Sequence, residues 1–406
     1  MILKMRKKLL LLLSILSFYA FQERQVSKDD VVILNGICVE RENKKPFTGV
    51  LKLTTSTKKE GLYLRFIEGI NHGVNYWYFN SGELKVACEI DRGKRHGSYR
   101  EYYITGQVKK EHNFVENVRE GIYKEYYANG ELKLERNYEK GKLEGVSKGY
   151  YENGDLRFTV LFKKDKLNGV YAAYYQGGGL ELEQMYNDGV QQGFYKEYYP
   201  NGALKSSVMI KDNLAHGEAN KYTEKGQLVL VQYYKDGQLD GQYTEYYDNG
   251  QLGVQQLYRK GLLDGLAKYY DTDGNLIEEK NYRKGELEGM YKKYTSTGIL
   301  LLTIDYKNGM KDGVYKVYSH GVQVAFEQRY KKDKLHGDYI EYYDNAKVSL
   351  VVPYNKGIVE GEVRSYSESG ELVYKENYDH GFFDEKLRKR IEDIQLKIDK
   401  HTKETK

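Results

Sequence analysis

The sequence predicts an all-β chain, an elongated antiparallel meander or solenoid of about fourteen 24-residue β-hairpin repeats with a short C-terminal helix. Three observations predict this fold. Glycine recurs every 24 residues from Gly49 to Gly361, and tyrosine follows it by five residues in thirteen successive units. Between these markers apolar residues alternate with period two, as in strands. A chain of 406 residues built this way is one array of small units, so function is expected to come from the array.

The first element is a leader over residues 1–21. Basic residues from Lys4 to Lys8 precede an apolar run from Leu9 to Phe21. Such a run is too short for a stable membrane span and is typical of a signal peptide. We therefore expect an exported protein, in the periplasm, in the cell envelope or secreted, with an uncleaved anchor as the alternative.

Residues 22–45 follow as an irregular hairpin around Asn35-Gly36, predicted to cap the N-terminal end of the array. At the other end, residues 385–406 form a charged tail. Leu387, Ile391, Ile394 and Ile398 recur with helical spacing there. The tail is predicted to be a helix that covers the edge of the last strand. A helix that binds a partner is the alternative.

The array itself occupies residues 46–384, and its turns are marked by small residues. Asn129-Gly130 stands between two strand-like runs and predicts a type I′ hairpin turn. A second turn follows, in which the position twenty residues after the periodic glycine is Gly, Asn or Asp in eleven successive units. These residues adopt the left-handed backbone conformation most easily. The periodic glycines are also expected to be structural turn residues, among them Gly121, Gly145, Gly169, Gly241 and Gly265.

The strands after the first turn carry their apolar residues on one face. Leu132, Leu134 and Tyr138 illustrate the pattern, which places residues 11, 13 and 17 positions after the glycine on the same side. Inserting one residue would turn the next strand over, which explains why the period never changes.

The combined pattern Y-x-x-Y-Y-x-N-G-x-L followed by Y-x-x-G-x-x-x-G, repeated over residues 46–384, resembles the MORN-variant repeat family of bacteria. The resemblance implies a binding or scaffolding module, which in this family sometimes stands beside a catalytic domain. Here the repeats fill nearly all of the chain after the leader, so we expect no such domain. The resemblance also implies a relation to YwqK-type antitoxins of toxin–antitoxin systems. Toxin neutralisation is therefore the alternative function.

Charge and composition restrict the classes of partner and chemistry. The net charge of +5 comes mainly from the two ends, so the array is close to neutral and lacks the basic stripe that nucleic acid requires. Peripheral contact with a membrane is disfavoured for the same reason. Cys38 and Cys88 lie about two units apart and are expected to be two free, packed thiols.

The sequence contains no pattern that indicates catalysis, a metal or a cofactor. The histidines before periodic glycines, such as His72 and His96, are one repeat apart and too distant to share a metal. Gly177-Gly178-Gly179 precedes a strand, whereas a phosphate-binding loop precedes a helix. We therefore expect no enzyme, no metal and no cofactor.

The repeated tyrosines are the remaining candidates for binding. One reading is that the rings only pack the sheet. The functional reading is that one face stays open and binds a protein or a glycan. The candidate residues, all five positions after a periodic glycine, are Tyr102, Tyr126, Tyr150, Tyr174, Tyr198 and Tyr246.

Overall fold

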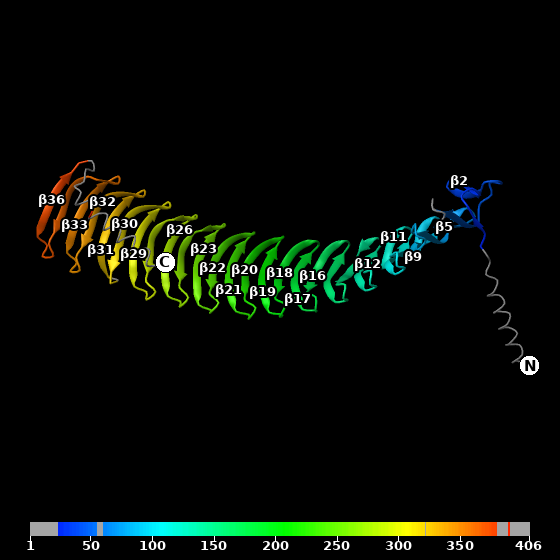
Figure 1. Ribbon diagram of the computed structural model, residues 1–406, viewed down its shortest axis with the longest axis horizontal. Helices are drawn as coiled ribbons and strands as arrows, with labels where there is room; N and C mark the ends of the chain where they lie inside the picture. The colour runs from blue at the N-terminus through cyan, green and yellow to red at the C-terminus, as the bar shows by residue number, and fades with distance from the viewer. Residues whose placement is uncertain (1–22, 55–59, 321, 380–388, 390–406) are drawn as a thin grey trace, which may run out of the picture. The chain divides into compact units, whose positions relative to one another are not determined.

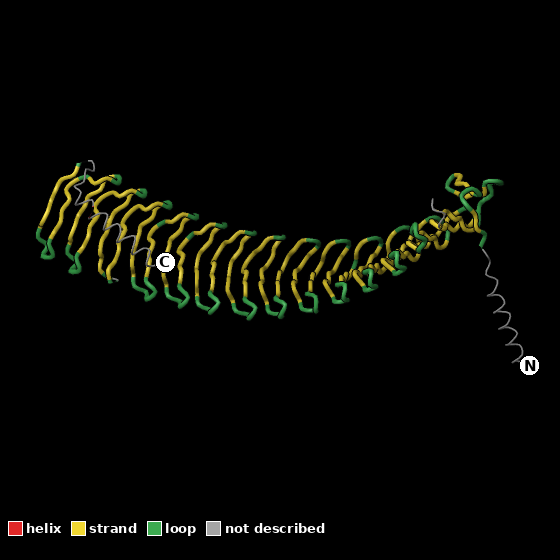
Figure 2. Tube along the Cα trace, in the orientation of Figure 1, coloured by secondary structure: helices red, strands yellow, loops and turns green. Residues whose placement is uncertain are grey.

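The computed structural model describes residues 23–54, 60–320, 322–379 and 389. The chain divides into two compact units, Met1–Val190 and Gln191–Lys406. In both units strands and short turns alternate regularly along the chain (Figures 1 and 2). The prediction of an all-β meander of repeats is confirmed. The predicted C-terminal helix falls on residues 385–406, which lie outside the described residues except for Lys389.

In the first unit, β4 to β17 follow one another in chain order as antiparallel neighbours. β1 pairs with β4 in parallel and covers its free edge. The strands of this unit are β1 (Gln25–Val26), β2 (Val31–Leu34), β3 (Ile37–Glu40), β4 (Gly49–Thr54), β5 (Glu60–Ile67), β6 (Ile70–Asn71), β7 (Gly73–Tyr78), β8 (Leu84–Asp91), β9 (Lys94–Tyr102), β10 (Val108–Val115), β11 (Val118–Tyr126), β12 (Leu132–Glu139), β13 (Lys142–Leu143), β14 (Gly145–Tyr150), β15 (Leu156–Lys163), β16 (Lys166–Tyr174) and β17 (Leu180–Asn187).

The second unit repeats the same antiparallel order. Its strands are β18 (Val190–Tyr198), β19 (Leu204–Lys211), β20 (Leu214–Tyr222), β21 (Leu228–Lys235), β22 (Gln238–Tyr246), β23 (Leu252–Arg259), β24 (Leu262–Leu263), β25 (Gly265–Tyr270), β26 (Leu276–Arg283), β27 (Glu286–Leu287), β28 (Gly289–Tyr294), β29 (Leu300–Lys307), β30 (Met310–Ser319), β31 (Gln323–Lys331), β32 (Lys334–Tyr342), β33 (Val348–Asn355), β34 (Ile358–Val359), β35 (Gly361–Tyr366) and β36 (Leu372–Tyr378).

The residues before β4 form a separate small hairpin. β2 and β3 pair around Asn35-Gly36, where both turn residues have positive φ. Cys38 and Phe47 are fully buried in the adjoining apolar cluster. Cys38 and Cys88 are both free and buried, so the prediction of two packed thiols is confirmed.

The two turns of each repeat differ from the predicted turn types. At Asn129-Gly130 only the glycine has positive φ, at +94°, so a type I′ turn was the wrong prediction. The asparagine serves another purpose there, because its Oδ1 accepts from the Glu131 N–H and its Nδ2 donates to the Glu152 carbonyl of the next repeat. A type I′-like pair occurs at the second turn, for example Lys140 and Gly141 with φ of 50° and 80°.

The periodic glycines occupy bulges between paired strands. Gly121, Gly145, Gly169, Gly241 and Gly265 have φ of 77°, 83°, 100°, 132° and 133°, which L-residues adopt only with strain. The strand register shifts at each of these sites, as between Val160 and Phe162 opposite the Gly169 segment. The 24-residue period is therefore imposed by the backbone.

Tyrosines six positions after the periodic glycine tie neighbouring repeats together. The Tyr127 hydroxyl donates to the Tyr150 carbonyl at 2.8 Å, and Tyr103 donates to the Tyr126 carbonyl in the same way. In the second unit Tyr247 and Tyr343 repeat this contact. Each such bond joins one hairpin loop to the next hairpin, so these rings have a structural role.

Candidate functional site

Alternation along the strands gives the sheet two chemically different faces. His112 stacks on Tyr99, with ring centroids 4.6 Å apart, and also contacts Tyr123. The neighbouring residue Glu111 points to the opposite face, where it accepts from the Tyr126 hydroxyl. We call the first side the aromatic face. In each repeat it carries the residues 2, 13, 15 and 17 positions after the periodic glycine. The other side is the polar face.

The tyrosines predicted to bind a ligand lie on the polar face. Tyr102, Tyr126, Tyr150, Tyr174, Tyr198 and Tyr246 are half-buried and one repeat or more apart. The Tyr126 hydroxyl donates to Glu111 at 2.7 Å, and burial together with this bond raises the pKa of Tyr126 to about 12. Tyr294 makes the equivalent bond to Glu279. Where this bond forms, the tyrosine contributes to the joint between repeats.

The aromatic face is hollowed in the first unit. A groove of about 610 Å³ extends over β5 to β9. Its lining residues are Leu64, Phe66, Asn71, Asn75, Trp77, Lys85, Val86, Cys88, Ile90, Arg95 and Tyr99. They come from successive strands because each strand contributes the residues that point to this face.

The floor of the groove has its polar groups satisfied within the fold. Asn75 is 2% exposed, and its Oδ1 accepts from the Arg65 N–H at 2.8 Å. Its Nδ2 donates to Oδ1 of Asn71 at 2.7 Å. A buried amide bonded in this way costs little and fixes the local strand pairing. Asn75 is therefore a structural residue.

The ring surfaces and cations at the rim remain available to a ligand. Neither the Trp77 indole N–H nor the Tyr99 hydroxyl has a hydrogen bond to the part of the chain that the structure describes. The Arg95 guanidinium lies 4.2 Å from the centroid of the Phe114 ring, and the Lys85 ammonium lies 5.6 Å from that of Phe79. Both cations are held beside the groove by contacts with rings, without a carboxylate partner among the described residues.

His112 continues the aromatic face beyond the groove. It is 8% exposed and lies among Tyr99, Phe114 and Tyr123. Burial, with a further contribution from the Arg119 charge, lowers the pKa of His112 to about 4. Its Nδ1 has no hydrogen-bond partner within the described ranges. A neutral imidazole in this stack is a packing group and adds no charge to the groove at neutral pH.

The side chains that line the groove are suited to binding. The described residues hold no cluster of three or more His, Cys, Asp or Glu side chains that could bind a metal ion. The groove combines two large rings, an apolar wall and two cations. These groups match a ligand with an apolar or sugar-ring surface and a negative charge.

The groove residues were missed by sequence reasoning, although a signal was present. Tyr99, Tyr123, Tyr171 and Tyr195 stand two positions after their glycines, and this second tyrosine series was visible in the sequence. The chain's one tryptophan, Trp77, was a further signal. The series five positions after the glycine is unbroken and therefore drew the prediction, whereas a binding series can vary between repeats.

Comparison with known families identifies the repeats. The family described as "MORN repeat variant" matches the chain at residues 95–116, 119–140, 143–164, 191–212, 239–260, 263–284 and 359–380. No protein of curated function matches the chain. Within the described residues, no helix has the length and hydrophobicity needed to cross a membrane.

Among solved structures, the chain is similar to toxin complexes at low scores. A TcdB2–TccC3 crystal structure is 12% identical over 80% of this chain and 21% of that chain, with a TM-score of 0.16. The Photorhabdus luminescens Tc holotoxin pore is 14% identical over 75% of this chain and 18% of that one, with a TM-score of 0.15. The chain thus spans about a fifth of the length of these structures, and the likeness carries no argument.

Proposed function

We propose that the chain, in which seven segments match the MORN repeat variant, acts as a non-catalytic scaffold that binds a protein or a glycan through its aromatic face. The observation that carries the proposal is the groove over β5 to β9. Trp77 and Tyr99 present ring surfaces there, and Arg95 and Lys85 supply positive charge. Rings with nearby donors are the usual means by which proteins hold sugars and extended peptides.

The same proposal places the protein outside the cytoplasm. It rests on the basic and apolar leader of residues 1–21, which lies outside the described residues. Localisation of a protein tagged at its C-terminus tests this part. Recovery in the periplasm, the envelope or the medium supports export, and recovery in the cytoplasm contradicts it.

The binding proposal is tested with Trp77 as the reporter. The full chain is titrated with charged and neutral oligosaccharides of equal length, for example tetragalacturonate and cellotetraose, while indole fluorescence is recorded. Peptides of matched charge form a second arm. We expect saturable binding of an anionic probe that weakens at least tenfold in Arg95→Ala.

Trp77→Ala and Tyr102→Ala form a matched pair for the two faces, with binding then measured by calorimetry. Trp77→Ala is expected to abolish binding, because it removes the ring on the aromatic face. Tyr102→Ala changes a ring on the polar face and is expected to leave affinity within twofold. The opposite result would assign binding to the tyrosines five positions after the glycines. If none of the probes binds at micromolar protein concentration, the proposed scaffold function is contradicted.

Toxin neutralisation is the second function, proposed from the repeat resemblance alone. It predicts that a neighbouring gene encodes a small toxic protein and that this protein forms a tight complex with the chain. Co-expression that fails to rescue growth would remove this alternative.

A further inference from the structure

Three arginines lie on the aromatic face of the first unit, at the edge of the groove and beyond it. Arg95 on β9 and Arg119 on β11 stand 22 positions after their periodic glycines, and Arg136 on β12 stands 15 positions after its own. The guanidinium carbon of Arg95 lies 4.2 Å from the centroid of the Phe114 ring. That of Arg119 lies 5.5 Å from the centroid of Tyr138. Both guanidiniums are therefore held against rings of this face.

Arg136 extends this group by one strand. It is paired in register with Tyr123, whose ring centroid also lies 5.8 Å from the guanidinium carbon of Arg119. The Nε of Arg136 is buried and has no hydrogen-bond partner among the described residues. Buried donors in folded proteins nearly always have a partner, and an unpaired one costs free energy. A partner from outside the chain would remove this cost.

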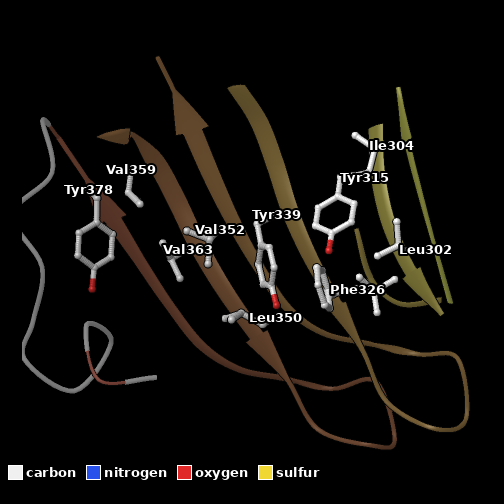
Figure 3. Packing of buried hydrophobic residues seen from close by; sticks show 11 residues of the cluster. Leu302, Ile304, Tyr315, Phe326, Tyr339, Leu350, Val352, Val359, Val363 and Tyr378 are labelled. Atoms are coloured by element: carbon white, nitrogen blue, oxygen red, sulfur yellow. The ribbon is translucent and has the colours of Figure 1, made fainter. Parts of the chain in front are cut away.

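The packing of the repeat does not require arginine at these positions. In the second unit Val359 holds the position of Arg95 and Arg119, and Val352 holds that of Arg136. Figure 3 shows both valines among apolar side chains, and both are fully buried. Six other repeats have leucine at the position of Arg95 and Arg119: Leu143, Leu167, Leu239, Leu263, Leu287 and Leu335. Because aliphatic side chains are sufficient for packing, the three positive charges have another role.

The described residues do not neutralise these charges. Two carboxylates approach this part of the aromatic face, and lysines already pair with both. Lys109 and Lys110 lie 2.8 Å and 3.8 Å from the carboxylate of Glu101. Lys133 lies 3.0 Å from that of Glu125. None of the three guanidiniums has an ion pair or a hydrogen bond with any residue that the structure describes, so an anionic ligand would find them free.

The surrounding sequence is basic as well. Residues 92–148 contain thirteen Lys and Arg and nine Asp and Glu, a net charge of +4 in an array that is otherwise acidic. Such a local excess attracts anions to one part of a nearly neutral protein. The positive part of the array thus coincides with the three arginines and borders the groove.

We propose that the groove and the three arginines form one surface that binds a linear acidic polysaccharide. This inference rests on the proposed function and names its ligand. Sugar rings lie on Trp77 and Tyr99, and carboxylates bind the guanidiniums, whose planar fork matches a carboxylate with two hydrogen bonds. Arg95 and Arg119 are two strand spacings apart, roughly 10 Å, so the ligand carries anionic groups at intervals along an extended chain.

A peptide fits this surface less well than a polysaccharide. The strands β7 to β12 each pair with a neighbour on both sides, so no strand edge is open to an added peptide strand. The backbone of an extended peptide lying here would lose water without gaining the hydrogen bonds of a sheet. A sugar chain needs only ring contacts and charged partners on one side, and its other hydroxyl groups stay in water.

The test measures by calorimetry how the full chain binds short and long acidic sugars. Digalacturonate is short enough to bind in the groove beside Arg95, whereas decagalacturonate and a heparin decasaccharide also reach β12. Arg119→Leu and Arg136→Val introduce residues that other repeats carry at these positions, such as Leu143 and Val160, so thermal stability should not fall. Lys124→Leu is the matched control, because it removes a positive charge from the polar face of the same strand, β11.

We expect one of the two long acidic sugars to bind at least tenfold more tightly than digalacturonate, because it engages several sites at once. Arg119→Leu and Arg136→Val should each weaken the binding of that long sugar at least fivefold and leave the affinity for digalacturonate within twofold. Lys124→Leu should leave both affinities within twofold. Cellodecaose, which has no charge, should bind at least tenfold more weakly than the long acidic sugar.

Several results would overturn this inference. If the long acidic sugars bind equally well to the wild type and to both arginine variants, the surface does not extend beyond the groove, and binding of digalacturonate would still support the proposed function. Tighter binding of decaglutamate or of a ten-nucleotide DNA strand would assign the arginines to an acidic peptide or to nucleic acid. If neither short nor long sugars nor peptides bind, the inference and the proposed function both fail.

Discussion

Replacing Gly93 tests whether glycine occurs in the second turn because of its left-handed backbone conformation or because a larger side chain would not fit. Gly93 has φ of +79°, and a Cβ placed on it would meet no atom within 4 Å. Gly93→Ala therefore adds no clash, and its cost comes from the left-handed backbone alone. Gly93→Asn is the matched control, because the same place one repeat later is held by Asn117 at φ of 70°.

The magnitude follows from these contacts. A left-handed conformation costs an L-residue about 1–2 kcal/mol. The stiffer unfolded chain of an alanine variant offsets part of this cost, so Gly93→Ala should lose about 1 kcal/mol, or about fivefold in the local unfolding equilibrium. In Gly93→Asn the side chain can accept from the Asn71 N–H, as Asn117 accepts from the Arg95 N–H at 2.8 Å. We expect that variant to stay within about 0.5 kcal/mol of wild type.

Urea unfolding followed by Trp77 fluorescence measures the effect. Trp77 lies on β7, which pairs with β8, and β8 leads into the turn at Gly93. A repeat array reports local stability at such a probe, because each repeat contacts mainly its neighbours. Equal losses in the alanine and asparagine variants, or no loss in either, would refute the backbone explanation of the glycine pattern.

Two further predictions concern His112 and Ala346. Burial of neutral His112 lowers its pKa from 6.5 to about 4. Its contribution to folding stability is therefore fully present above pH 6.5, and it is lost as the pH falls toward 4 and the folded protein must bury a charged imidazole. The loss should reach about 2 kcal/mol in Trp77-detected unfolding. His112→Gln, which introduces the residue that Gln328 provides at the same repeat position, should flatten this pH dependence. Ala346 has φ of 63° where most other repeats have glycine, so Ala346→Gly should gain about 0.5–1 kcal/mol in thermal unfolding. The reverse change at Gly250, with φ of 86°, should lose stability, and the same sign in both variants would contradict the argument.

Much of the fold could be predicted because the turns and strands of each repeat depend on residues within that repeat. The series from Gly49 to Gly361 fixed the unit length, and the position of Asn117 and Gly141 marked a turn with positive φ. The type of the other turn could not be predicted from Asn129-Gly130, because asparagine is favoured both for positive φ and for side-chain bonds to the backbone. Only the neighbouring repeat, whose Glu152 carbonyl accepts from Asn129, decides between these roles.

The sequence predicted an aromatic binding surface, but it did not identify the residues that line the groove. Aromatic binding followed from tyrosine content, but Tyr126 is engaged by Glu111 on the polar face. Trp77 and Tyr99 line the groove instead. In a regular array every position repeats, so periodicity alone does not distinguish a ring that joins repeats from one that faces an open groove.

The sequence by itself determined the period, the hairpins, the glycine bulges and the separation of Cys38 from Cys88, because these depend on local backbone geometry and chain distance. The tertiary structure decided which tyrosines bond across repeats, where a groove opens on the aromatic face, and which side chains of that face are buried, such as Leu350 and Tyr378. Those features arise when side chains from different repeats come to lie on one face of the sheet. Which of these side chains touch depends on how the strands pair, and the strand pairing is known only from the structure.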